Sequence, residues 1–549
     1  MADDETRADS FDVVIIGAGF SGMYMLHKTR ELGLSAVILE AAGDVGGTWY
    51  WNRYPGARCD IHSMDYSYSF DDDLQQEWEW SERYSPQPEI LKYAAHVAER
   101  FDLRCDIRFG TRVGSANWDD NANQWVLETE TGDAVRGTWC VLAVGCLSVP
   151  QRPSFDGLDD YKGDWYHTGL WPHEEVDFTG KDVAVIGTGS SAIQSIPQIA
   201  KQARHLTVFQ RTPNFSVPAW NRPLTEEEVR PIKENYAAYR ENARWSESGY
   251  NGEDAHESGH DVSDNRRRSE LERRWAEGGF TMLSTFTDVG NDAAINKIVA
   301  DFAHEKIREK VKDPKVADLL CPTSHPFGTK RLCVDIDYHD TYNRPNVSLV
   351  DINAAPIERL TAEGLKTTET DYHFDAIVFA IGFDAMTGPI LNIDIRGVEG
   401  RSLRKEWEDG PHTYLGLGMA GYPNLFPVTG PQSPSVLTNM MSAIEQHIEW
   451  ISDCLAYMTD KGLDRIEART DAQQDWVRHN KEVGDTTLYP LANSWYVGTN
   501  IPGKPRVFLP YVGGFGEYRK ICDDVAADDY RGFVVASHDR RGDDLWDSA

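Results

Sequence analysis

The sequence predicts an α/β fold, because a βαβ pattern occurs twice along the chain. Phe11–Ile16 is a short apolar run that ends at a glycine, and Met23–Leu32 and Ala36–Glu40 have the composition of the helix and strand that would follow. The same order recurs far downstream, with strands expected at Asp182–Ile186 and Leu206–Gln210 on either side of a helix. We therefore expect two Rossmann-like dinucleotide-binding domains, not a solenoid of short repeats.

Changes in composition indicate where the chain passes between these two domains. Trp139–Val144 and Ala376–Ala380 are strand-like, whereas 222–318 is charged, lacks strand runs and contains helical stretches such as Ile298–Val311. We expect this segment to be a helical insertion in the second domain. The first domain would then comprise residues 1–150 and 385–549, and the second would comprise residues 151–221 and 319–384 around the insertion at 222–318.

The composition excludes several classes of protein. The chain has 549 residues, enough for two or more domains of about 100–200 residues each. Its 55 Lys and Arg against 88 Asp and Glu give a net charge of −33, which disfavours nucleic acid and anionic membrane surfaces as partners. No uninterrupted apolar run is long enough to span a bilayer. The acidity itself has two explanations, an ordinary solvated surface or adaptation to a salt-rich cytoplasm.

The cysteines and the start of the chain bear on its compartment. The eight cysteines are scattered, and none forms a Cys-x-x-Cys pair, which disfavours a metal site, a redox dithiol and a disulfide framework. Residues 1–10 are acidic and lack the basic and then apolar pattern of a signal peptide. We therefore expect a cytoplasmic protein without a bound metal.

The first βαβ pattern contains a glycine fingerprint. Gly17 would allow the tight turn after the strand, Gly19 would let a pyrophosphate approach the backbone, and Gly22 would let the helix pack on the strand. Glu40 lies 23 positions after Gly17, where an acid can accept hydrogen bonds from a ribose diol but would repel a 2′-phosphate. This predicts a site for FAD or NAD, and a purely structural glycine turn is the alternative.

The second fingerprint differs in its third position and in the residue after the second strand. Gly187 and Gly189 are followed by Ala192, and Arg211, with Thr212 beside it, stands where the first unit has its acid. An arginine can bind a 2′-phosphate in a bidentate manner, so this domain should prefer NADPH unless Arg211 only forms a surface ion pair. A chain with one site for FAD and another for NADPH would pass hydride from the nicotinamide to the flavin.

The region between the two fingerprints differs from that of a disulfide reductase. Those enzymes carry a pair of cysteines just after the first fingerprint, whereas this chain has only Cys59 nearby, in the aromatic segment Gly46–Asp60. Ahead of the second unit lies Tyr161-Lys-Gly163-Asp-Trp-Tyr-His167-Thr-Gly-Leu-Trp171-Pro172. This segment resembles the F-x-G-x-x-x-H-x-x-x-W-P/D pattern of type I Baeyer–Villiger monooxygenases, with Tyr161 in place of the usual phenylalanine.

The resemblance covers essentially the whole chain and is nearest to the phenylacetone and steroid monooxygenases. Trp171-Pro172 favours this family over the N- and S-oxidising flavin monooxygenases, whose pattern ends in Tyr or Phe and which remain the enzymatic alternative. A flavin-binding redox sensor is the non-enzymatic alternative. The matching segments are Gly46–Phe70, Gly187–Pro213, Lys330-Arg331, Gly382-Phe383-Asp384 and Ser494–Gly503.

The family resemblance implies an activity and a mechanism. FAD is reduced by NADPH, the reduced flavin reacts with O₂ to give a C4a-peroxyflavin, and its anion attacks a ketone carbonyl, so that an ester or lactone is formed. Arg331 matches the arginine that stabilises the peroxyanion, a fixed cation aimed at developing negative charge. Asp60 matches the carboxylate that orients this arginine and contacts the nicotinamide end of NADPH. Without the resemblance, Lys330-Arg331 would be interpreted as a surface basic pair.

Further positions are carried over from the family one by one. FAD contacts are implied at Thr48, Trp49, Trp51, Asp60, Tyr66 and Val113. NADP contacts are implied at Arg58, Cys59, Gly187, Gly189, Ser190, Ser191, Ala192, Gln194, Ser195, Arg211, Thr212, Lys330, Arg331 and Trp495, the last in a mobile loop near 490–505. His167 and Trp171 resemble linker residues that couple domain motion to catalysis, and we expect a conformational role for His167 rather than acid–base work.

The segment Thr429–Leu437 matches a loop that lines the substrate pocket in the phenylacetone and steroid enzymes, with Val436 and Leu437 as pocket residues. Gln432 stands where a glycine is usual, so we expect a change in the backbone or in the shape of the pocket. The resemblance favours bulkier linear, aryl or cyclic ketones as substrates, together with O₂, and it is compatible with a monomer.

Overall fold

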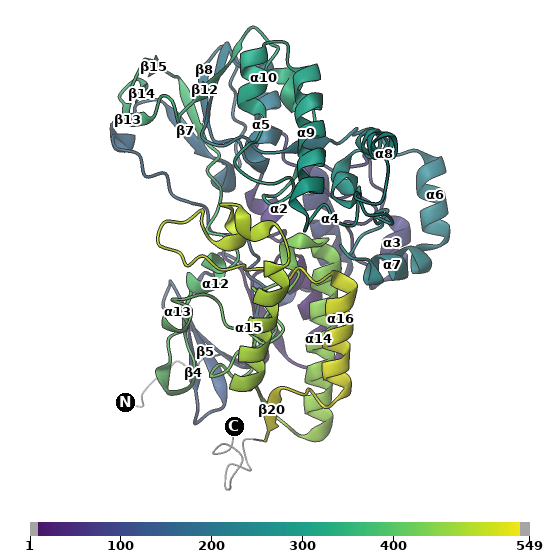
Figure 1. Cartoon of the computed structure of the whole chain (residues 1–549). Helices are drawn as coiled ribbons and strands as arrows, with labels where there is room; N and C mark the ends of the chain where they lie inside the picture. The colour runs from purple at the N-terminus through teal and green to yellow at the C-terminus, as the bar shows by residue number, and fades with distance from the viewer. Residues whose placement is uncertain (1–8, 538–549) are drawn as a thin grey trace.

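Two lobes, each organised by its own β-sheet, make up the part of the chain that this computed structural model describes, residues 9–537. In Figure 1 the sheet of the second lobe lies above that of the first, and helices from the segment 226–277 project at one side of the molecule. Parallel strand pairs form the centre of both sheets. The expected α/β fold with two Rossmann-like units is confirmed.

The first sheet combines a parallel part with an antiparallel part. Its strands lie in the order β17 (Asp394–Arg396), β4 (Val113–Asp119), β5 (Gln124–Thr129), β6 (Ala134–Leu142), β1 (Asp9–Ile16), β2 (Ala36–Leu39) and β3 (Ile107–Arg108), with β18 (Leu425–Pro427) also paired to β6. β6, β1, β2 and β3 are parallel, as a βαβ unit requires, whereas β4, β5 and β6 are antiparallel. The strand expected at 139–144 begins earlier, at Ala134, and ends at Leu142.

The second sheet is entirely parallel. Its order is β12 (Val347–Asp351), β9 (His205–Gln210), β8 (Asp182–Ile186), β16 (Ala376–Phe379) and β7 (Asp164–His167). β8 and β9 flank α5 (Ser190–Gln202), which confirms the second βαβ unit. Because β7 pairs with β16, the segment around the motif histidine forms one edge of this sheet. A small antiparallel sheet packs against the same lobe and consists of β13 (Ile357–Thr361), β14 (Gly364–Thr367) and β15 (Asp371–His373).

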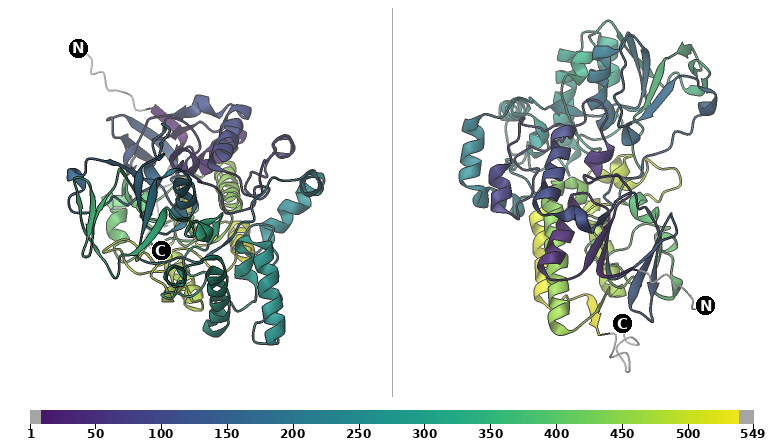
Figure 2. Two further views of the ribbon diagram at one scale, coloured as in Figure 1. Left: turned by 90° about the horizontal axis from the view of Figure 1, so that it is seen from above. Right: turned by 180° about the vertical axis from the view of Figure 1, so that it is seen from behind.

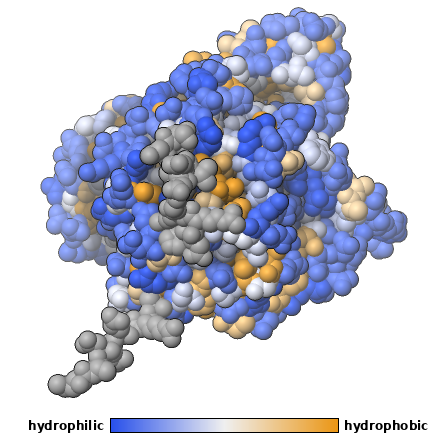
Figure 3. Space-filling view, turned by 90° about the horizontal axis from the view of Figure 1, so that it is seen from below, coloured by the Kyte–Doolittle hydropathy of each residue, from blue (hydrophilic) through white to orange (hydrophobic). Residues whose placement is uncertain are grey.

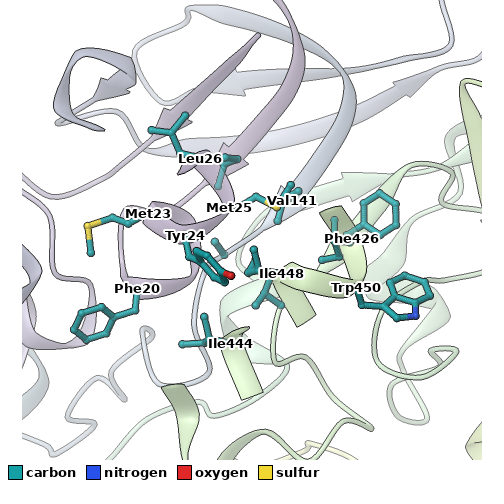
Figure 4. Packing of buried hydrophobic residues seen from close by; sticks show 14 of the residues in the cluster. Phe20, Met23, Tyr24, Met25, Leu26, Val141, Phe426, Ile444, Ile448 and Trp450 are labelled. Carbon is teal, nitrogen blue, oxygen red and sulfur yellow. The ribbon is translucent and has the colours of Figure 1, made fainter. Parts of the chain in front are cut away.

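The core of the first lobe lies between two helices that are distant in the sequence. α1 (Phe20–Glu31) packs against α14 (Met440–Lys461), and Figure 4 shows side chains of both helices in one buried cluster. Tyr24 of α1 and Ile448 of α14 belong to this cluster, and burying one such apolar side chain stabilises the fold by about 1.5–3 kcal/mol. α16 (Phe515–Ala527) packs against α14 (Figure 1). Trp476 of α15 (Thr470–Asp485) contacts Tyr518 of α16. The C-terminal part of the chain therefore completes the first lobe.

The segment expected to be a helical insertion contains no strand between residues 222 and 318, all of which lie in the described range. Its helices are α6 (Glu226–Glu234), α7 (Tyr236–Trp245), α8 (Asp264–Glu277), α9 (Ala293–Lys310) and α10 (Pro314–Leu320). Tyr236 packs into the core of the first lobe, whereas Ile307 and Ala317 pack into that of the second. Two further views show these teal helices along one side of the molecule (Figure 2). The segment thus contacts both lobes.

The remaining α-helices and strands of the described chain connect these larger units. They are α2 (Thr48–Trp51), α3 (Asp72–Glu77), α4 (Gln87–Arg100), α11 (Tyr338–Thr341), α12 (Gly388–Leu391), α13 (Leu403–Glu406), the parallel pair β10 (Ser216–Pro218) and β11 (Cys333–Asp335), and the antiparallel pair β19 (Arg465–Ala468) and β20 (Phe533–Ala536). Across residues 9–537, we find no helix with the length and apolar character needed to cross a membrane.

The surface is rich in charged and polar side chains. Figure 3 shows one face on which hydrophilic residues dominate and hydrophobic residues gather in smaller groups between them. Many surface charges are paired, as Arg268 is with Glu272 and with Glu305, each at an N–O distance of 2.6 Å. Exposed pairs contribute about 0–1 kcal/mol each, so the stability of the fold rests on the buried clusters and not on these contacts.

α14 carries one carboxyl group that is fully enclosed by the first lobe. Glu445 Oε1 accepts a hydrogen bond from the backbone N–H of Ser69 at 2.5 Å, and Oε2 accepts one from the Ser69 hydroxyl at 2.7 Å. Burial, together with the nearby carboxylate of Glu449, raises the pKa of Glu445 from 4.5 to about 7, although the Ser69 contacts and Arg240 lower it in part. The protonated form is therefore favoured in the folded state.

We predict that Glu445→Gln removes a pH-dependent loss of stability. A carboxyl whose pKa is raised on folding stabilises the fold fully below pH 4.5, and this contribution is lost as the pH rises through about 7. The shift corresponds to about 3 kcal/mol, so the unfolding temperature of the variant should fall less than that of the wild type between pH 5 and pH 8. Thermal unfolding at a series of pH values checks this, with the exposed Glu482→Gln as control. Parallel profiles for E445Q and the wild type would contradict it.

Candidate active site

Both glycine fingerprints form sharp turns at the carboxyl ends of parallel strands. Gly17 follows β1 with φ +105°, and Gly187 follows β8 with φ +114°. A Cβ atom at Gly17 would lie 2.6 Å from a carbonyl oxygen at the end of β6, and one at Gly187 would lie 2.3 Å from the corresponding oxygen at the end of β16. The backbone conformation and the close approach both exclude a side chain here, which explains the glycine at each position.

The helices that follow the two turns begin with unpaired backbone N–H groups. Gly19 is the N-cap of α1 and Gly189 is the N-cap of α5, and neither helix has a side chain that caps it. No atom lies within 4 Å of the position that a Cβ would take at Gly189, so the backbone is open to an approaching group. Uncapped N–H groups together with the helix dipole form an anion site, which fits the pyrophosphate of a dinucleotide at each turn.

The residues after β2 and β9 give the two sites opposite charge. Glu40 is buried and accepts hydrogen bonds from the N–H groups of Ala18 and Ala42, and burial raises its pKa. Arg211 is exposed at the end of β9, and burial together with Arg211 lowers the pKa of the half-buried Lys330. Among the described residues, no carboxylate pairs with either cation. Two neighbouring cations without a counter-ion repel each other, so they fit a doubly charged 2′-phosphate.

Asp60 and Arg331 are 271 residues apart and form a bidentate ion pair. Both Nε and Nη2 of Arg331 donate to Asp60, at 3.1 and 2.8 Å, and Nη1 donates to the carbonyl oxygen of Val436 at 2.6 Å. The Phe280 ring lies 4.9 Å below the guanidinium, and Asn214 Nδ2 donates to the Arg331 carbonyl oxygen. Burial alone would lower the pKa of Arg331, but Asp60 raises it above its ordinary value. Arg331 is therefore a charged and fixed group.

The segment that carries Asp60 is held against the second lobe by α5. Gln194 accepts a hydrogen bond from the Tyr54 hydroxyl at 2.8 Å and donates to the Arg58 carbonyl oxygen at 3.1 Å. The Arg58 side chain pairs with Glu82 at 2.9 Å. The residues expected near NADP in this segment are thus brought next to the N-terminal half of α5.

A cavity of about 60 Å³ lies at the Arg331 guanidinium. Leu283, Val436 and Leu437 line it, and about a quarter of the Arg331 and Asp60 side chains remains exposed. Four further residues of the lining, absent from the sequence-based predictions, are aromatic: Tyr250, Phe280, Tyr489 and Tyr496. A fixed cation at an otherwise mainly apolar wall suits a neutral substrate on which negative charge develops.

A sequence signal could have identified Tyr496 but not Tyr250 or Phe280. Tyr496 follows the predicted Trp495 directly, and burial raises its pKa to about 12, so the hydroxyl is neutral beside Arg331. Tyr250 and Phe280 belong to the segment 222–318, which carries no motif, and only the fold brings them to the cavity.

A larger cavity, of about 410 Å³, borders the segment that follows Asp60. His62, Arg83, Trp220 and Arg222 are among its lining residues. None of the residues predicted for cofactor or substrate lines it. Of the two cavities, only the smaller is lined by predicted site residues, namely Arg331, Val436 and Leu437.

The loop that contains Trp495 is docked against the chain where it leaves the second lobe. Trp495 is half-buried in a cluster with Val436 and Met386. Lys504 Nζ pairs with Asp384 at 2.6 Å, and Asn500 Nδ2 donates to the Phe383 carbonyl oxygen at 2.7 Å. The expected Trp495 loop therefore lies next to the cavity and to the segment 382–386.

The positions expected to contact FAD occupy two faces of the first sheet. Trp49 is buried and its Nε1 donates to the Tyr66 hydroxyl at 3.1 Å, whereas Trp51 is half-buried and Thr48 is exposed in the same short helix. Val113 begins β4 and packs in the cluster on the opposite face of the sheet from Trp49 and Tyr66. Val113 is thus separated by the sheet from Trp49 and Tyr66, and it packs in the same cluster as Leu39, the residue before Glu40.

The serines of the second fingerprint contact neighbouring elements. Ser190 lies 3.3 Å from the Cys333 thiol, and Ser191 lies 3.2 Å from the Thr168 hydroxyl, which belongs to the motif segment 161–172. Ser195 and Ala192 are fully buried in α5, and Cys59 is buried as well. The carbonyl oxygen of Thr212 accepts a hydrogen bond from Thr188 at 2.8 Å. Thr212 is thereby fixed beside Arg211.

The motif residues His167 and Trp171 are buried within the second lobe. His167 Nδ1 accepts the N–H of Gly169 at 2.9 Å, and burial lowers the pKa of His167 to about 4. Trp171 packs against Phe178 in the core of the lobe. Tyr161, where the motif has phenylalanine, donates its hydroxyl to a backbone carbonyl oxygen at 2.9 Å, so the departure leaves no unpaired group. A neutral buried imidazole suits a conformational role.

Gln432 adopts the backbone conformation that a glycine would favour. Its φ is +66°, in the left-handed region, and the side chain is only 4% exposed. The expected change in the loop is therefore in the side chain and its contacts, whereas the backbone remains of the glycine type.

Comparisons with known proteins agree with this geometry. A family model described as pyridine nucleotide-disulphide oxidoreductase matches residues 14–266, which include both glycine fingerprints. The eight cysteines of this chain are free in the structure, so the match reflects the dinucleotide-binding framework and not a dithiol site.

Several curated relatives match over nearly the full length of both chains. A Baeyer–Villiger monooxygenase of Pseudooceanicola batsensis is 39% identical over 534 residues, with 96% of this chain and 97% of that protein covered. The acetone monooxygenase (methyl acetate-forming) of a Gordonia species is 39% identical, with coverage of 96% and 99%. A phenazine N-monooxygenase of Lysobacter antibioticus is 41% identical, with coverage of 96% and 97%.

Solved structures of related enzymes superpose on nearly the whole of this chain. An oxidised steroid monooxygenase bound to NADP superposes with a TM-score of 0.93 at 49% identity, and the match covers 96% of this chain and all of that one. A complex of the enzyme OTEMO with FAD and NADP gives a TM-score of 0.93 at 39% identity, with the same coverage. The two fingerprints, the cation pair and the Asp60–Arg331 site agree with these matches. The chain therefore belongs to the Baeyer–Villiger monooxygenases, which use FAD and NADPH to insert one oxygen atom of O₂ next to a ketone carbonyl.

Proposed function

We propose that Arg331 and Asp60 are the residues that carry out this reaction at the cavity. The observation that supports the proposal is the bidentate contact between them at the wall of the cavity, where the side chains remain partly exposed. When bound, FAD and NADPH supply the hydride transfer and the activation of O₂. Arg331 holds its positive charge toward the ketone oxygen as negative charge develops there, and Asp60 fixes the plane of the guanidinium.

We propose that Arg211, Thr212 and Lys330 bind the 2′-phosphate of NADPH. The two cations have no carboxylate partner in the described range, and Lys330 directly precedes Arg331 in the chain. The same short segment would therefore reach the two ends of NADPH, with Lys330 at the phosphate and Arg331 at the cavity. Glu40 would bind the ribose of FAD, since a buried carboxylate disfavours a phosphate there.

We propose the FAD domain at residues 1–150 and 385–549 and the NADP domain at 151–221 and 319–384, with 222–318 as a helical insertion that also contacts the FAD domain. The packing of α14 on α1 and the pairing of β16 with β8 support these boundaries. We further propose a cytoplasmic monomer, because the free, mostly buried cysteines suit a reducing compartment and the Asp60–Arg331 pair forms within a single chain.

We propose bulkier linear, aryl or cyclic ketones as substrates. The aromatic and aliphatic lining of the cavity supports the apolar character of these ketones, and the 49% identity to a steroid monooxygenase supports their size. Oxidation of a heteroatom is a second candidate activity, because one relative that is 41% identical is named a phenazine N-monooxygenase.

We predict that the enzyme, loaded with FAD and supplied with NADPH and a ketone panel, forms esters that contain one oxygen atom from labelled O₂. Mass spectrometry of the products checks this, with sulfides and amines in the same panel. Turnover of heteroatom compounds without any labelled ester would exclude the ketone activity in favour of the second candidate.

We predict that Arg331→Ala still allows NADPH to reduce the flavin but lowers ester formation by about 100-fold or more, because a fixed cation at the developing negative charge is lost. Arg331→Lys keeps a charge but not the bidentate geometry, so its ester yield should be intermediate. Stopped-flow reduction and product analysis on the same samples separate the two steps. Ester formation by R331A at the wild-type rate would remove the assigned role.

We predict that Arg211→Ala raises the KM for NADPH by about 10-fold or more while the KM for NADH stays nearly unchanged. The expected size follows from the loss of a charge-assisted hydrogen bond worth about 1.5–3 kcal/mol. Arg204→Ala is the matched control, because Arg204 precedes β9 at its other end and pairs with Asp182. An unchanged preference for NADPH in R211A, or the same change in R204A, would contradict the assignment.

A further inference from the structure

The loop Thr429–Leu437 has an unusual backbone. Thr429, Gln432 and Ser435 have φ values of +51°, +66° and +43°, although none of them is a glycine. A Cβ atom makes this left-handed region unfavourable, so three such residues within seven positions persist only if their surroundings hold them in place. The loop is buried at all three positions.

The side-chain amide of Gln432 supplies much of this restraint. Its Oε1 accepts hydrogen bonds from the Thr413 backbone N–H at 2.9 Å and from the Thr413 hydroxyl at 2.8 Å. Its Nε2 donates to the Pro411 carbonyl oxygen at 2.9 Å. The backbone of the same residue donates to Leu509 and accepts from Trp476 Nε1. One residue thus joins the loop to three other segments of the chain.

A glycine at this position would keep the backbone contacts and lose the amide contacts. Glycine adopts a φ of +66° without strain, so the conformation alone does not require a glutamine. What the glutamine adds is a buried attachment to Thr413 and Pro411 through three hydrogen bonds of its amide, at the cost of a strained backbone. Compared with a glycine, Gln432 therefore makes the backbone conformation less favourable but holds the loop more rigidly.

The restrained loop ends at the candidate active site. Ser435 donates its hydroxyl to the Thr429 carbonyl oxygen at 2.8 Å, which closes the loop on itself. The next residue, Val436, accepts the Arg331 Nη1 hydrogen bond at 2.6 Å, and Val436 and Leu437 line the cavity. The position of this wall and one hydrogen bond of Arg331 both depend on the loop.

We propose that Gln432 is a positioning residue that fixes the Val436–Leu437 wall and, through the Val436 carbonyl group, the Arg331 guanidinium, and that it thereby determines which ketones the cavity accepts. The inference rests on the proposed role of the Arg331 cavity as the ketone site. Because the amide of Gln432 keeps the Val436–Leu437 wall rigid, the cavity discriminates between ketones of different shape. A wall held only by the backbone contacts of residue 432 would adapt to them.

The test is Gln432→Gly in the FAD-loaded enzyme. The KM for the best ketone should rise by about 10-fold, the differences in kcat/KM across a size-graded ketone panel should shrink, and less ester should form per NADPH consumed. The KM for NADPH and the rate of flavin reduction should remain those of the wild type. A loss of stability alone would not produce this separation between ketone and NADPH parameters.

Asn424→Gly is the matched control. Asn424 is buried at φ +57°, and its amide also makes three hydrogen bonds, in this case all to backbone groups, those of Thr138, Asp464 and Ile466. It lies outside the lining of the cavity. This variant should lower the unfolding temperature but keep the ketone KM and the selectivity of the wild type. Equal changes in selectivity for Q432G and N424G would overturn the proposal.

Two further variants separate the possible outcomes. Thr413→Val removes the hydroxyl that donates to Gln432 and also contacts Pro431 and Gly416, and it leaves the strained residue unchanged. It replaces Q432G if that variant does not fold, and it should shift ketone selectivity in the same direction. Leu437→Ala changes the wall directly. If L437A changes the ketone KM while Q432G and T413V keep the wild-type selectivity, the cavity is the ketone site but the role proposed for Gln432 is wrong. If L437A also leaves the ketone parameters unchanged, the ketone site lies elsewhere and the proposed function of the cavity is wrong.

Discussion

The ion pair between Asp60 and Arg331 is the interaction on which the rest of the site depends. It joins the segment after the first fingerprint to the segment before β11, and the two residues are 271 positions apart. Neighbouring side chains restrain both partners, because Gln194 of α5 holds the segment that leads to Asp60 and Asn214 holds the backbone of Arg331. The guanidinium is therefore both charged and immobile, as electrostatic stabilisation of a developing negative charge requires.

The charge distribution explains how a strongly acidic chain binds an anionic cofactor. The net charge is −33, yet Arg211, Lys330 and Arg331 lie close to the second fingerprint. Arg331 is paired with Asp60, whereas Arg211 and Lys330 have no carboxylate partner in the described part of the chain. This difference gives adjacent residues separate roles, since an unpaired cation attracts a phosphate and a paired one is held in position.

The residues that the sequence identified are those with a local signal. The glycines follow strands at fixed spacing, Glu40 and Arg211 stand at equivalent places after the second strands, and the fold confirms both βαβ units. Tyr250 and Phe280 could not be found in this way, because an aromatic residue in a helical segment is ordinarily a packing residue. Segment boundaries were also approximate: α1 begins at Phe20, immediately after its glycine N-cap, and not at Met23. The departure at Gln432 was visible in the sequence, but its conformation and its partners were not.

By itself, the sequence determined the fold class, the two dinucleotide fingerprints, the opposite charges after their second strands and the family to which the motif segment belongs. These features depend on neighbours within about 25 residues, and the spacing of side chains along a strand or helix carries that information. Only the tertiary structure decided which distant groups meet: Asp60 with Arg331, Val436 with the guanidinium, and Gln432 with Thr413 and Pro411. The physical reason is that these contacts are set by how two sheets and the helices between them pack, and side chains in a close-packed interior are specified by all their neighbours at once.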